Sequence, residues 1–427
     1  LDPADYPLAG GTAGDLFGWP KVKDDRNLVG AMAAAAPTVA LGMHKAHGLF
    51  GRTAWPELVS PAIPLAAEGP AVDWHMLIEI ATAYAHLSRD PGCRAAFLPG
   101  NAPPIPPAAV APEPVLRLPN AALARTLAAI ASDGPDALYK RTIGRALCAD
   151  FKDAGGCVSE ADLVACEARV REAASVRHGA YRVDVVPELS GGPTMIRAFE
   201  GLARRGVNPR SGKPLDAQTF VAIAAALNDA WNNRFDTMGD TPTTAITSTT
   251  THISVVDRDG NMVSLTQTLL SLFGSRFLSP STGILLNNAI NWFDPRPGTP
   301  NSIGPGKRAL CNYCPAIMVG DDQAVAIGGS GGRKIMPAVF QLLVMLANGL
   351  SLDKAFHAPR IDVSGGERVV VDRDLPDDVQ AALAAQFQTL RVERTAYPAQ
   401  KENAESQDYV EGPKAFAEKR KPNWQNK

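Results

Sequence analysis

The sequence predicts a layered α/β fold with antiparallel sheets, and three observations support this prediction. Residues 1–249 are rich in alanine and have the pattern of successive capped helices. From residue 250 onward, short runs of β-branched residues alternate with turn residues. One long apolar segment, residues 335–347, then has the length of a helix. Helices, then strands, then one helix that packs back on them are typical of layered α/β proteins, although this pattern alone does not choose the topology.

The helices of the first half are predicted from their ends. They are expected over residues 121–132, 163–173, 193–205 and 217–235. Asn120 caps the first of them, and Ser159 with Asp162 forms a capping-box variant before the second. Pro193 occupies the first turn of the third helix, and Gly206 ends it.

Two segments of the first half are predicted to lack regular structure. Residues 103–114 contain many prolines and are expected to form an extended loop. Residues 237–249 are polar and threonine-rich, without periodicity, and indicate a flexible linker. A break in the chain is sterically easy in such a linker.

Thr250 opens the first of two predicted hairpins. The runs 250–257 and 262–268 are rich in β-branched residues and flank an Asp-Gly turn, which is a strong hairpin signal. A second hairpin is expected over 317–327. If the peptide bond before Thr250 is cut, the new α-amino group lies beside the hydroxyl of the same residue. That amine can act as a base and make the hydroxyl a nucleophile.

Six short motifs, in a fixed order, carry a family resemblance. They are Pro187–Gly192, Thr249–Asp257, Ser281–Asn288, Pro305–Arg308 with Cys314–Ala316, Gly328–Gly332 and Ala358–Ile361. Together they resemble the γ-glutamyltransferase family of N-terminal-nucleophile (Ntn) hydrolases, over roughly residues 10–390. In that family, the segment corresponding to residues 283–288 is a Gly-Ile-Leu-Leu-Asn-Asn strand.

The resemblance implies a four-layer αββα Ntn sandwich with antiparallel sheets. Residues 1–249 would be the mostly helical large-subunit region and residues 250–400 the small-subunit region, in one composite domain. Family members have further residues before Leu1, including part of the central sheet, so we interpret the N-terminal part as truncated. Residues 401–427 form a charged tail, within which 406–422 is similar to the terminal helix of crotonase-type enoyl-CoA hydratases. We prefer an amphipathic charged tail, because a crotonase needs a CoA-binding core.

The resemblance also implies the catalytic residues. Thr250 would be the nucleophile. Its hydroxyl would first attack the carbonyl of Thr249, which cleaves the chain, and then the substrate amide. Thr268 would hydrogen-bond it from the paired strand, and the backbone N–H groups of Gly331 and Gly332 would form the oxyanion hole. From the residues alone, ordinary strand threonines and a glycine-rich turn are the alternatives, and the cleavage position could slip by one residue.

The residues expected to bind substrate depart from the family pattern. No arginine stands at residues 2–6, Leu270 replaces an asparagine, Ala289 replaces a Gln or Glu, Trp292 replaces an acid, and Cys311-Asn312 replaces a Ser-Ser pair. Each change removes a polar partner of the α-carboxylate or α-ammonium of a γ-glutamyl group. Burying an unpaired charge is costly, so a neutral or apolar acyl group is favoured. The alternative is that Asn291 or Arg276 supplies replacement contacts.

Three functional interpretations follow from these motifs. The first is a self-processing N-terminal-threonine amidohydrolase or acyltransferase that acts on a small amide through an acyl-enzyme. The second is a conventional γ-glutamyltransferase or glutathione hydrolase, and the third is a catalytically silent remnant or binding protein. The expected partners are a small amide or γ-glutamyl-like substrate and a water or amine acceptor. The subunits would be a large and a small one from one precursor, or a dimer of these.

Composition and charge exclude other classes of function. The net charge of −2 gives no electrostatic footprint for nucleic acid, and no apolar run of membrane-spanning length is found. Six scattered cysteines do not suggest a disulfide framework, and at the lone CxxC of Cys311 and Cys314 we expect packed free thiols. The histidines lack metal-ligand spacing, and His252 is expected to be a structural hydrogen-bonding residue. No metal or cofactor is predicted, and the compartment is left open between cytoplasm and periplasm.

Overall fold

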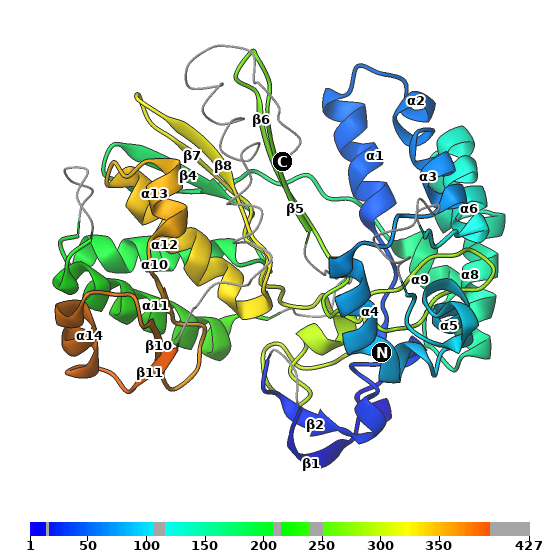
Figure 1. Cartoon of the computed structure of the whole chain (residues 1–427), viewed down its shortest axis with the longest axis horizontal. Helices are drawn as coiled ribbons and strands as arrows, with labels where there is room; N and C mark the ends of the chain where they lie inside the picture. Colours follow the sequence, from blue (N-terminus) through cyan, green and yellow to red (C-terminus); the bar gives the residue numbers. More distant parts are fainter. Residues whose placement is uncertain (14–16, 106–115, 208–214, 240–250, 393–427) are drawn as a thin grey trace. The chain divides into compact units, whose positions relative to one another are not determined.

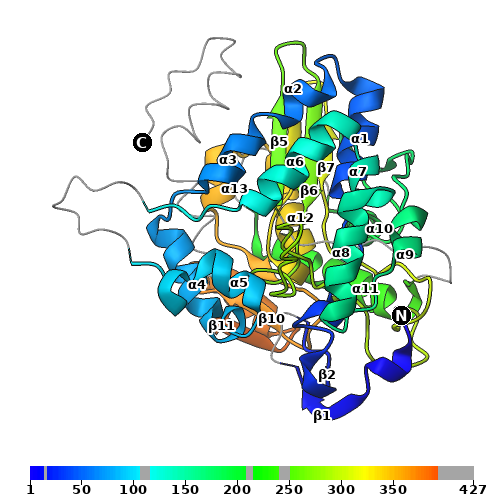
Figure 2. The same ribbon diagram turned by 90° about the vertical axis from the view of Figure 1, so that its right-hand side faces the viewer.

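The computed structural model describes residues 1–13, 17–105, 116–207, 215–239 and 251–392. These residues form two compact units, each described by itself (Figures 1 and 2). The helical unit contains residues 1–171, 238–251 and 267–311. The sheet unit contains residues 172–237, 252–266 and the chain from 312 onward. Each unit therefore draws on both sides of residue 250.

Nine α-helices are described in the helical unit. They are α1 (Val39–Phe50), α2 (Trp55–Val59), α3 (Ala62–Glu68), α4 (Trp74–Leu87), α5 (Pro91–Phe97), α6 (Ala121–Asp133), α7 (Asp136–Tyr139), α8 (Thr142–Asp153) and α9 (Glu160–Ala165). An antiparallel pair, β1 (Leu8–Thr12) and β2 (Pro20–Val22), precedes them. The 3₁₀ turns of this unit are η1 (Pro3–Asp5), η2 (Lys23–Asp25), η3 (Ala31–Ala33), η4 (Pro99–Asn101) and η5 (Ala289–Trp292).

A long irregular segment, residues 275–288, is held in the helical unit by polar side chains of the helices. Asn120 caps α6 by accepting from the N–H of Leu123, and its Nδ2 donates to the carbonyl of Gly283 at 2.9 Å. The hydroxyl of Thr126 donates to the carbonyl of Thr282 at 2.7 Å. Buried backbone N–H and C=O groups that lie outside helices and sheets need hydrogen-bond partners of this kind. The helices therefore determine the course of this segment.

The sheet unit contains the remaining strands and helices. Its strands are β3 (Ala174–His178), β4 (Tyr181–Val185), β5 (Thr251–Val256), β6 (Met262–Gln267), β7 (Ala316–Val319), β8 (Ala324–Ile327), β9 (Ile361–Asp362), β10 (Val369–Asp372) and β11 (Thr389–Val392). Its helices are α10 (Gly192–Arg204), α11 (Ala217–Thr237), α12 (Ile335–Ala347), α13 (Leu352–His357), α14 (Asp377–Ala384) and the 3₁₀ turn η6 (Gly332–Lys334).

The main sheet has four antiparallel strands in the order β3-β4-β7-β8, and α10, α11 and α12 cover it (Figure 1). All residues of α12 except Ala338 are buried. A helix that is apolar on all sides is expected in the core rather than on the surface. A hairpin of β5 and β6 and a three-stranded sheet in the order β11-β10-β9 complete the unit.

Several predicted elements are confirmed. The helices over 121–132, 193–205 and 217–235 are found within two residues of their predicted ends, and α12 has the predicted bounds. Both hairpins are present, and the capping box of Ser159 with Asp162 is formed. The antiparallel main sheet is as predicted, and strands β10 and β11 alone among the described strand pairs are parallel.

Other predictions are wrong. The helix expected over 163–173 ends at Ala165, because Cys166 is already extended and leads toward β3. The expected strand over 283–288 is reduced to one antiparallel bridge between Leu278 and Leu285.

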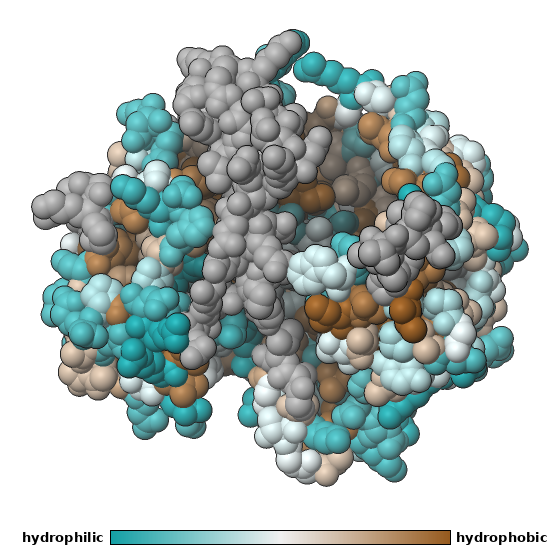
Figure 3. Space-filling view, in the orientation of Figure 1, coloured by the Kyte–Doolittle hydropathy of each residue, from teal (hydrophilic) through white to brown (hydrophobic). Residues whose placement is uncertain are grey.

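The surface of the helical unit carries exposed apolar side chains. On α4, Trp74 and Ile78 are more than half exposed, and hydrophobic residues gather around this helix in the space-filling view (Figure 3). Within the part of the chain that the structure describes, no helix is long and apolar enough to cross a membrane.

Candidate active site

The β5–β6 hairpin carries His252, which is held between two hydroxyl groups. Its Nδ1 lies 2.9 Å from Thr266 Oγ1, and its Nε2 lies 3.0 Å from Ser254 Oγ. Burial lowers the pKa of His252, so the neutral ring is favoured. The predicted structural role is confirmed in this respect, since both ring nitrogens are engaged within the hairpin. Thr249 and Thr250 lie outside the described residues.

The hairpin is fixed to β8 through serine hydroxyls. Ser254 Oγ donates to the carbonyl of Ala326, and Ser264 Oγ donates to the carbonyl of Ile327, both at 2.9 Å. The next residue, Gly328, has no room for a side chain, because a Cβ there would lie 2.2 Å from His252 Nδ1. The hairpin and the start of the glycine loop are therefore packed directly together.

The glycine loop ends with two residues that require glycine. Gly331 has a φ of 129° and Gly332 a φ of 60°, both in the left-handed region. Neither N–H group has a recorded hydrogen-bond partner among the described residues. Both groups lie at the start of η6, the 3₁₀ turn that leads into α12, and the N-terminus of a helix favours negative charge. Their conformation and position are those expected of an oxyanion hole.

A strained segment follows Thr268 in the helical unit. Leu270, Phe273 and Arg276 have φ values of 81°, 55° and 54°, which side chains rarely adopt. The hydroxyl of Thr268 accepts from the N–H of Leu270 at 3.2 Å. Backbone strain persists where the surroundings enforce it, and it clusters at functional sites. This concentration of strain supports a functional role for the segment.

Asn288 holds this segment and the neighbouring Asn287 holds Ala35, and no role was predicted for either from the sequence. Asn288 accepts from the N–H of Ser271 at 3.0 Å and donates from Nδ2 to the carbonyl of Leu28 at 3.1 Å. Asn287 forms a pair of bonds with the backbone of Ala35, at 3.0 and 2.9 Å. Both side chains are buried. Their only sequence signal was their place in the Leu-Leu-Asn-Asn motif.

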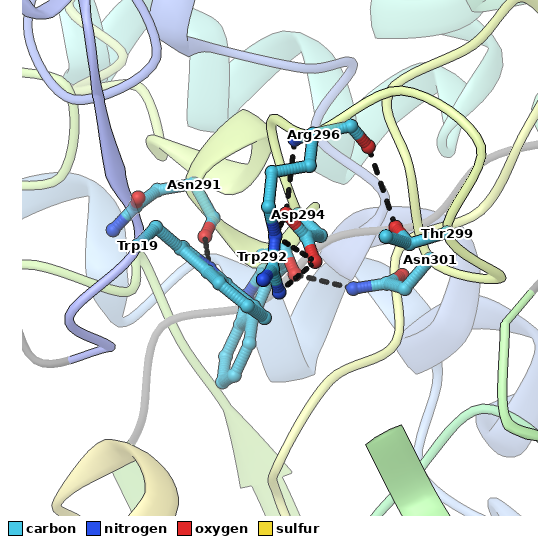
Figure 4. Close-up of polar contacts among 7 residues, drawn as sticks. All are labelled: Trp19, Asn291, Trp292, Asp294, Arg296, Thr299 and Asn301. Atoms are coloured by element: carbon cyan, nitrogen blue, oxygen red, sulfur yellow. Dashed lines mark hydrogen bonds and ion pairs between the residues drawn. The ribbon is translucent and has the colours of Figure 1, made fainter. Parts of the chain in front are cut away.

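The region that replaces the family's ammonium-binding acid is shown in Figure 4. Trp292 is 2% exposed, and its ring packs 5.1 Å from that of Phe17. Asn291 is buried, with its carbonyl accepting from Trp19 Nε1 at 3.2 Å and its Oδ1 accepting from Asn27 at 3.2 Å. Its side-chain oxygen is thus already occupied, which weakens Asn291 as a replacement contact.

The only acidic residue between 289 and 301, Asp294, is neutralised within the same region. Arg296 donates to Asp294 from Nε at 2.9 and 3.1 Å and from Nη2 at 2.6 Å (Figure 4). These hydrogen bonds raise the pKa of Arg296. The guanidinium also lies over the Trp19 ring, 5.8 Å from its centroid. Asp294 therefore cannot act as an unpaired acid in place of the one lost at Trp292.

The other two candidate substrate residues are also buried. Cys311 is 3% exposed, in agreement with the expectation of packed free thiols, and Asn312 is 4% exposed. Arg276 has a largely buried guanidinium whose Nε lacks a partner among the described residues. Burial lowers the pKa of Arg276. No group of three or more metal-ligating side chains occurs in the described ranges.

A family model for gamma-glutamyltranspeptidase matches residues 10–249 and 215–423. The chain belongs to the γ-glutamyltranspeptidase family. The second match includes most of the charged tail, residues 401–427, for which the sequence suggested a crotonase resemblance.

Two relatives illustrate the range of this family. The acylase ACY 1 proenzyme of Pseudomonas sp. (strain V22) is 31% identical over 398 residues, covering 85% of this chain and 70% of that protein. A glutathione hydrolase proenzyme of Pseudomonas sp. (strain A14) is 30% identical over 383 residues, covering 78% of this chain and 65% of the relative. The chain is accordingly an enzyme, an Ntn hydrolase of the γ-glutamyltranspeptidase and acylase type.

The fold agrees with this family. The crystal structure of a cephalosporin acylase from Bacillus halodurans superposes with a TM-score of 0.70 at 22% identity, covering 85% of this chain and 72% of that one. The predicted Ntn-hydrolase fold class is thereby confirmed. The roles of Thr250, Thr268, Gly331 and Gly332 remain predictions, as do those of Leu270, Asn291, Trp292, Cys311 and Asn312.

Proposed function

We propose that this enzyme is a self-processing amidohydrolase or acyltransferase that uses Thr250 as its nucleophile and acts on a small amide other than a γ-glutamyl compound. Cleavage after Thr249 would yield a large subunit of residues 1–249 and a small subunit that begins at Thr250. The polar linker before Thr250 and the hairpin that follows it support this cleavage position.

In the proposed reaction, Thr250 Oγ attacks the amide carbonyl while the new α-amine takes the hydroxyl proton. The N–H groups of Gly331 and Gly332 stabilise the oxyanion, and Thr268 orients the nucleophile. The α-ammonium then gives its proton to the leaving amine as the C–N bond breaks. Water or an amine acceptor attacks the resulting ester and releases the acyl group.

The observation that carries the proposed specificity is the pairing of Asp294 with Arg296. With Trp292 in place of the family's acid and Asp294 already neutralised, the segment from 289 to 301 offers no unpaired carboxylate to an α-ammonium. An unpaired buried ammonium is costly, so the zwitterionic γ-glutamyl group is disfavoured. Leu270 and Trp292 favour a neutral or apolar acyl chain instead.

Two measurements test this proposal. N-terminal sequencing of the smaller fragment should begin Thr-Thr-His, and Thr250→Ala should abolish both processing and turnover, because one oxygen serves both reactions. An active, uncut chain of 427 residues would contradict the cleavage. The kcat/KM for simple acyl p-nitroanilides should exceed that for γ-glutamyl-p-nitroanilide, and a tenfold preference for the γ-glutamyl donor would establish the conventional activity instead.

A further inference from the structure

We infer that Arg234 is a positioning residue that fixes the side-chain amide of Asn312, so that the N–H groups of Asn312, and not its oxygen, face the acyl group of the substrate. This inference rests on the proposed function, because Asn312 is a candidate substrate residue only within that reaction. It adds to that function the polarity of the hydrogen bond and the residue that determines it.

Arg234 lies near the end of α11 in the core of the sheet unit. It is 2% exposed, and its guanidinium lies 5.5 Å from the ring centroid of Trp231. Its Nη1 donates to the carbonyl of Ser190 at 2.8 Å and to Thr194 Oγ1 at 3.1 Å, while Nη2 donates to Asn312 Oδ1 at 2.8 Å. These partners come from around the start of α10, at Ser190 and Thr194, and from the segment before β7, at Asn312. They hold the guanidinium in one place.

The chemistry of arginine decides the orientation of Asn312. A guanidinium has only donors, so the amide must turn its oxygen toward Arg234. The amide group of Asn312 therefore directs its nitrogen away from Arg234. Nδ2 of Asn312 has no hydrogen-bond partner among the described residues, and this atom is not completely buried. Asn312 is 4% exposed, and this nitrogen is the part of its amide that remains available as a donor.

The backbone around Asn312 restricts any other arrangement. The N–H of Gly191 donates to the carbonyl of Tyr313 at 2.9 Å. A Cβ on Gly191 would lie 3.0 Å from the carbonyl oxygen of Asn312, so the two chain segments are in close contact. With its backbone held and its oxygen engaged, Asn312 presents a fixed donor.

This polarity differs from that of the serine found at this position in the family pattern. A serine hydroxyl rotates and can either donate or accept, whereas the Asn312 amide held by Arg234 can only donate. The guanidinium charge and the amide dipole point in the same direction, which favours an oxygen acceptor on the acyl chain. The selection against a γ-glutamyl group that is proposed above therefore rests on its ammonium and not on this contact. An acyl group that carries a donor at this position is disfavoured, because two donors would face each other.

The test uses two p-nitroanilides of equal chain length that differ at one atom. The δ-ketohexanoyl anilide carries a ketone oxygen at the carbon where a γ-glutamyl chain carries its carboxylate, and the δ-methylhexanoyl anilide carries a methyl group there. The processed parent enzyme should prefer the ketone about tenfold in kcat/KM, mainly through KM, which is the effect of one hydrogen bond. A ratio near one in the parent overturns the inference.

Asn312→Asp is the decisive variant, because an aspartate can still pair with Arg234 but presents only acceptors. The preference for the ketone over the methyl anilide should disappear or reverse. Thr194→Val is the matched control, since it removes another acceptor of the same guanidinium and leaves the contact with Asn312. This control should keep the parent ratio. An unchanged ratio in Asn312→Asp, or an equal loss in Thr194→Val, contradicts the role of the amide.

A binding measurement makes the result independent of turnover. In nitrogen-15 spectra of the parent protein, the side-chain amide resonance of Asn312, identified by its absence in Asn312→Asp, should shift on addition of δ-ketohexanoate. It should not shift with δ-methylhexanoate, and Arg234→Met should remove the difference. Identical responses to both acids overturn the inference. Failure of the proposed function is seen separately, as an uncut chain without activity on either anilide.

Discussion

The glycine loop of the sheet unit and the 289–301 segment of the helical unit differ in how closely they match the family pattern. The loop matches it in backbone conformation, whereas the segment departs from it in its side chains. In the loop, Gly331 and Gly332 have positive φ angles, and their N–H groups have no partner among the described residues, as the proposed oxyanion hole requires. In the 289–301 segment, Trp292 is packed in place of an acid and Asp294 is paired with Arg296. In the proposed reaction the loop acts through backbone atoms, which do not depend on a side chain, whereas substrate recognition depends on side chains. A new acyl specificity can therefore arise without loss of the catalytic parts.

The largest expected effect tests the glycine loop. Gly331→Ala should lower kcat by about 10²- to 10³-fold, because a φ of 129° excludes a Cβ and the N–H donor must move. Gly329→Ala is the control, since its Cβ would meet Val339 at an ordinary 3.7 Å. It should have a much smaller effect on kcat, measured on the acyl anilide that the enzyme prefers. An unchanged kcat in Gly331→Ala would locate the oxyanion hole elsewhere.

The second prediction concerns the stability of the sheet that supports this loop. Burial lowers the pKa of His178 to about 4, and its Nε2 has no partner among the described residues. The unfolded chain takes up a proton near pH 6.5, while the folded protein resists protonation until about pH 4. The stabilising contribution is therefore complete above pH 6.5 and is lost as the pH falls to 4. The loss should be about 3 kcal/mol of unfolding free energy.

Urea unfolding at pH 7 and pH 4.5 measures this contribution. His178→Phe, which keeps a ring beside Phe199, should unfold with a smaller change between the two pH values than the parent. If parent and variant lose stability in parallel, another group controls the acid response. The kcat values of the glycine-loop variants would then have to be compared within a pH range in which the folded fraction of each protein is constant.

The third prediction tests the role of the 289–301 segment in substrate recognition. Arg296→Gln should release the carboxylate of Asp294 and raise the kcat/KM for γ-glutamyl-p-nitroanilide relative to a neutral acyl anilide by about tenfold. Arg258→Gln, at a side chain that is 93% exposed and pairs with Asp259, is the control and should leave the ratio unchanged. Trp292→Asp is a poorer test, because it removes a buried indole that packs on Phe17.

If the ratio does not change in Arg296→Gln, the neutralised Asp294 is not what disfavours the γ-glutamyl group. The absence of an arginine at residues 2–6 and the replacement of asparagine by Leu270 would then remain as causes. The comparison between the two regions would be weakened, since the 289–301 segment would no longer account for specificity.

Local signals in the sequence predicted the parts that depend on local structure. The Asp-Gly turn predicted the β5–β6 hairpin, and an unbroken apolar run predicted the bounds of α12. The sequence also contains a signal for β3 and β4, because Val176 and Val183 alternate with the polar residues Arg177 and Arg182. Alternation of this kind predicts a half-buried strand.

The contacts that fix the candidate site were not predictable in this way. Asn288 meets Leu28, and Arg234 meets Asn312, across long separations in the chain. Such pairs are determined by tertiary packing, and no local pattern encodes them. The pairing of Asp294 with Arg296 is local, but its bidentate geometry depends on the turn that brings the two side chains together. The family resemblance therefore located the candidate residues, whereas only the structure showed which of their atoms were already engaged.

The smallest expected effect concerns Leu270, where the strained backbone and the changed side chain meet. Its φ of 81° disfavours a leucine, whereas asparagine tolerates the left-handed region. Leu270→Asn should therefore raise the unfolding free energy by about 0.5–1 kcal/mol, although it exchanges an apolar residue for a polar one. Leu272→Asn, the same change at a nearby residue without a positive φ, should give no such gain. If both variants are equally destabilised, the apolar packing of Leu270 outweighs the backbone strain, and Leu270 contributes an apolar surface to the proposed substrate site. If only Leu270→Asn is stabilised, the backbone at residue 270 has the conformation suited to asparagine although the side chain has changed. Backbone conformation and side chain would then differ here in the same way as the glycine loop differs from the 289–301 segment.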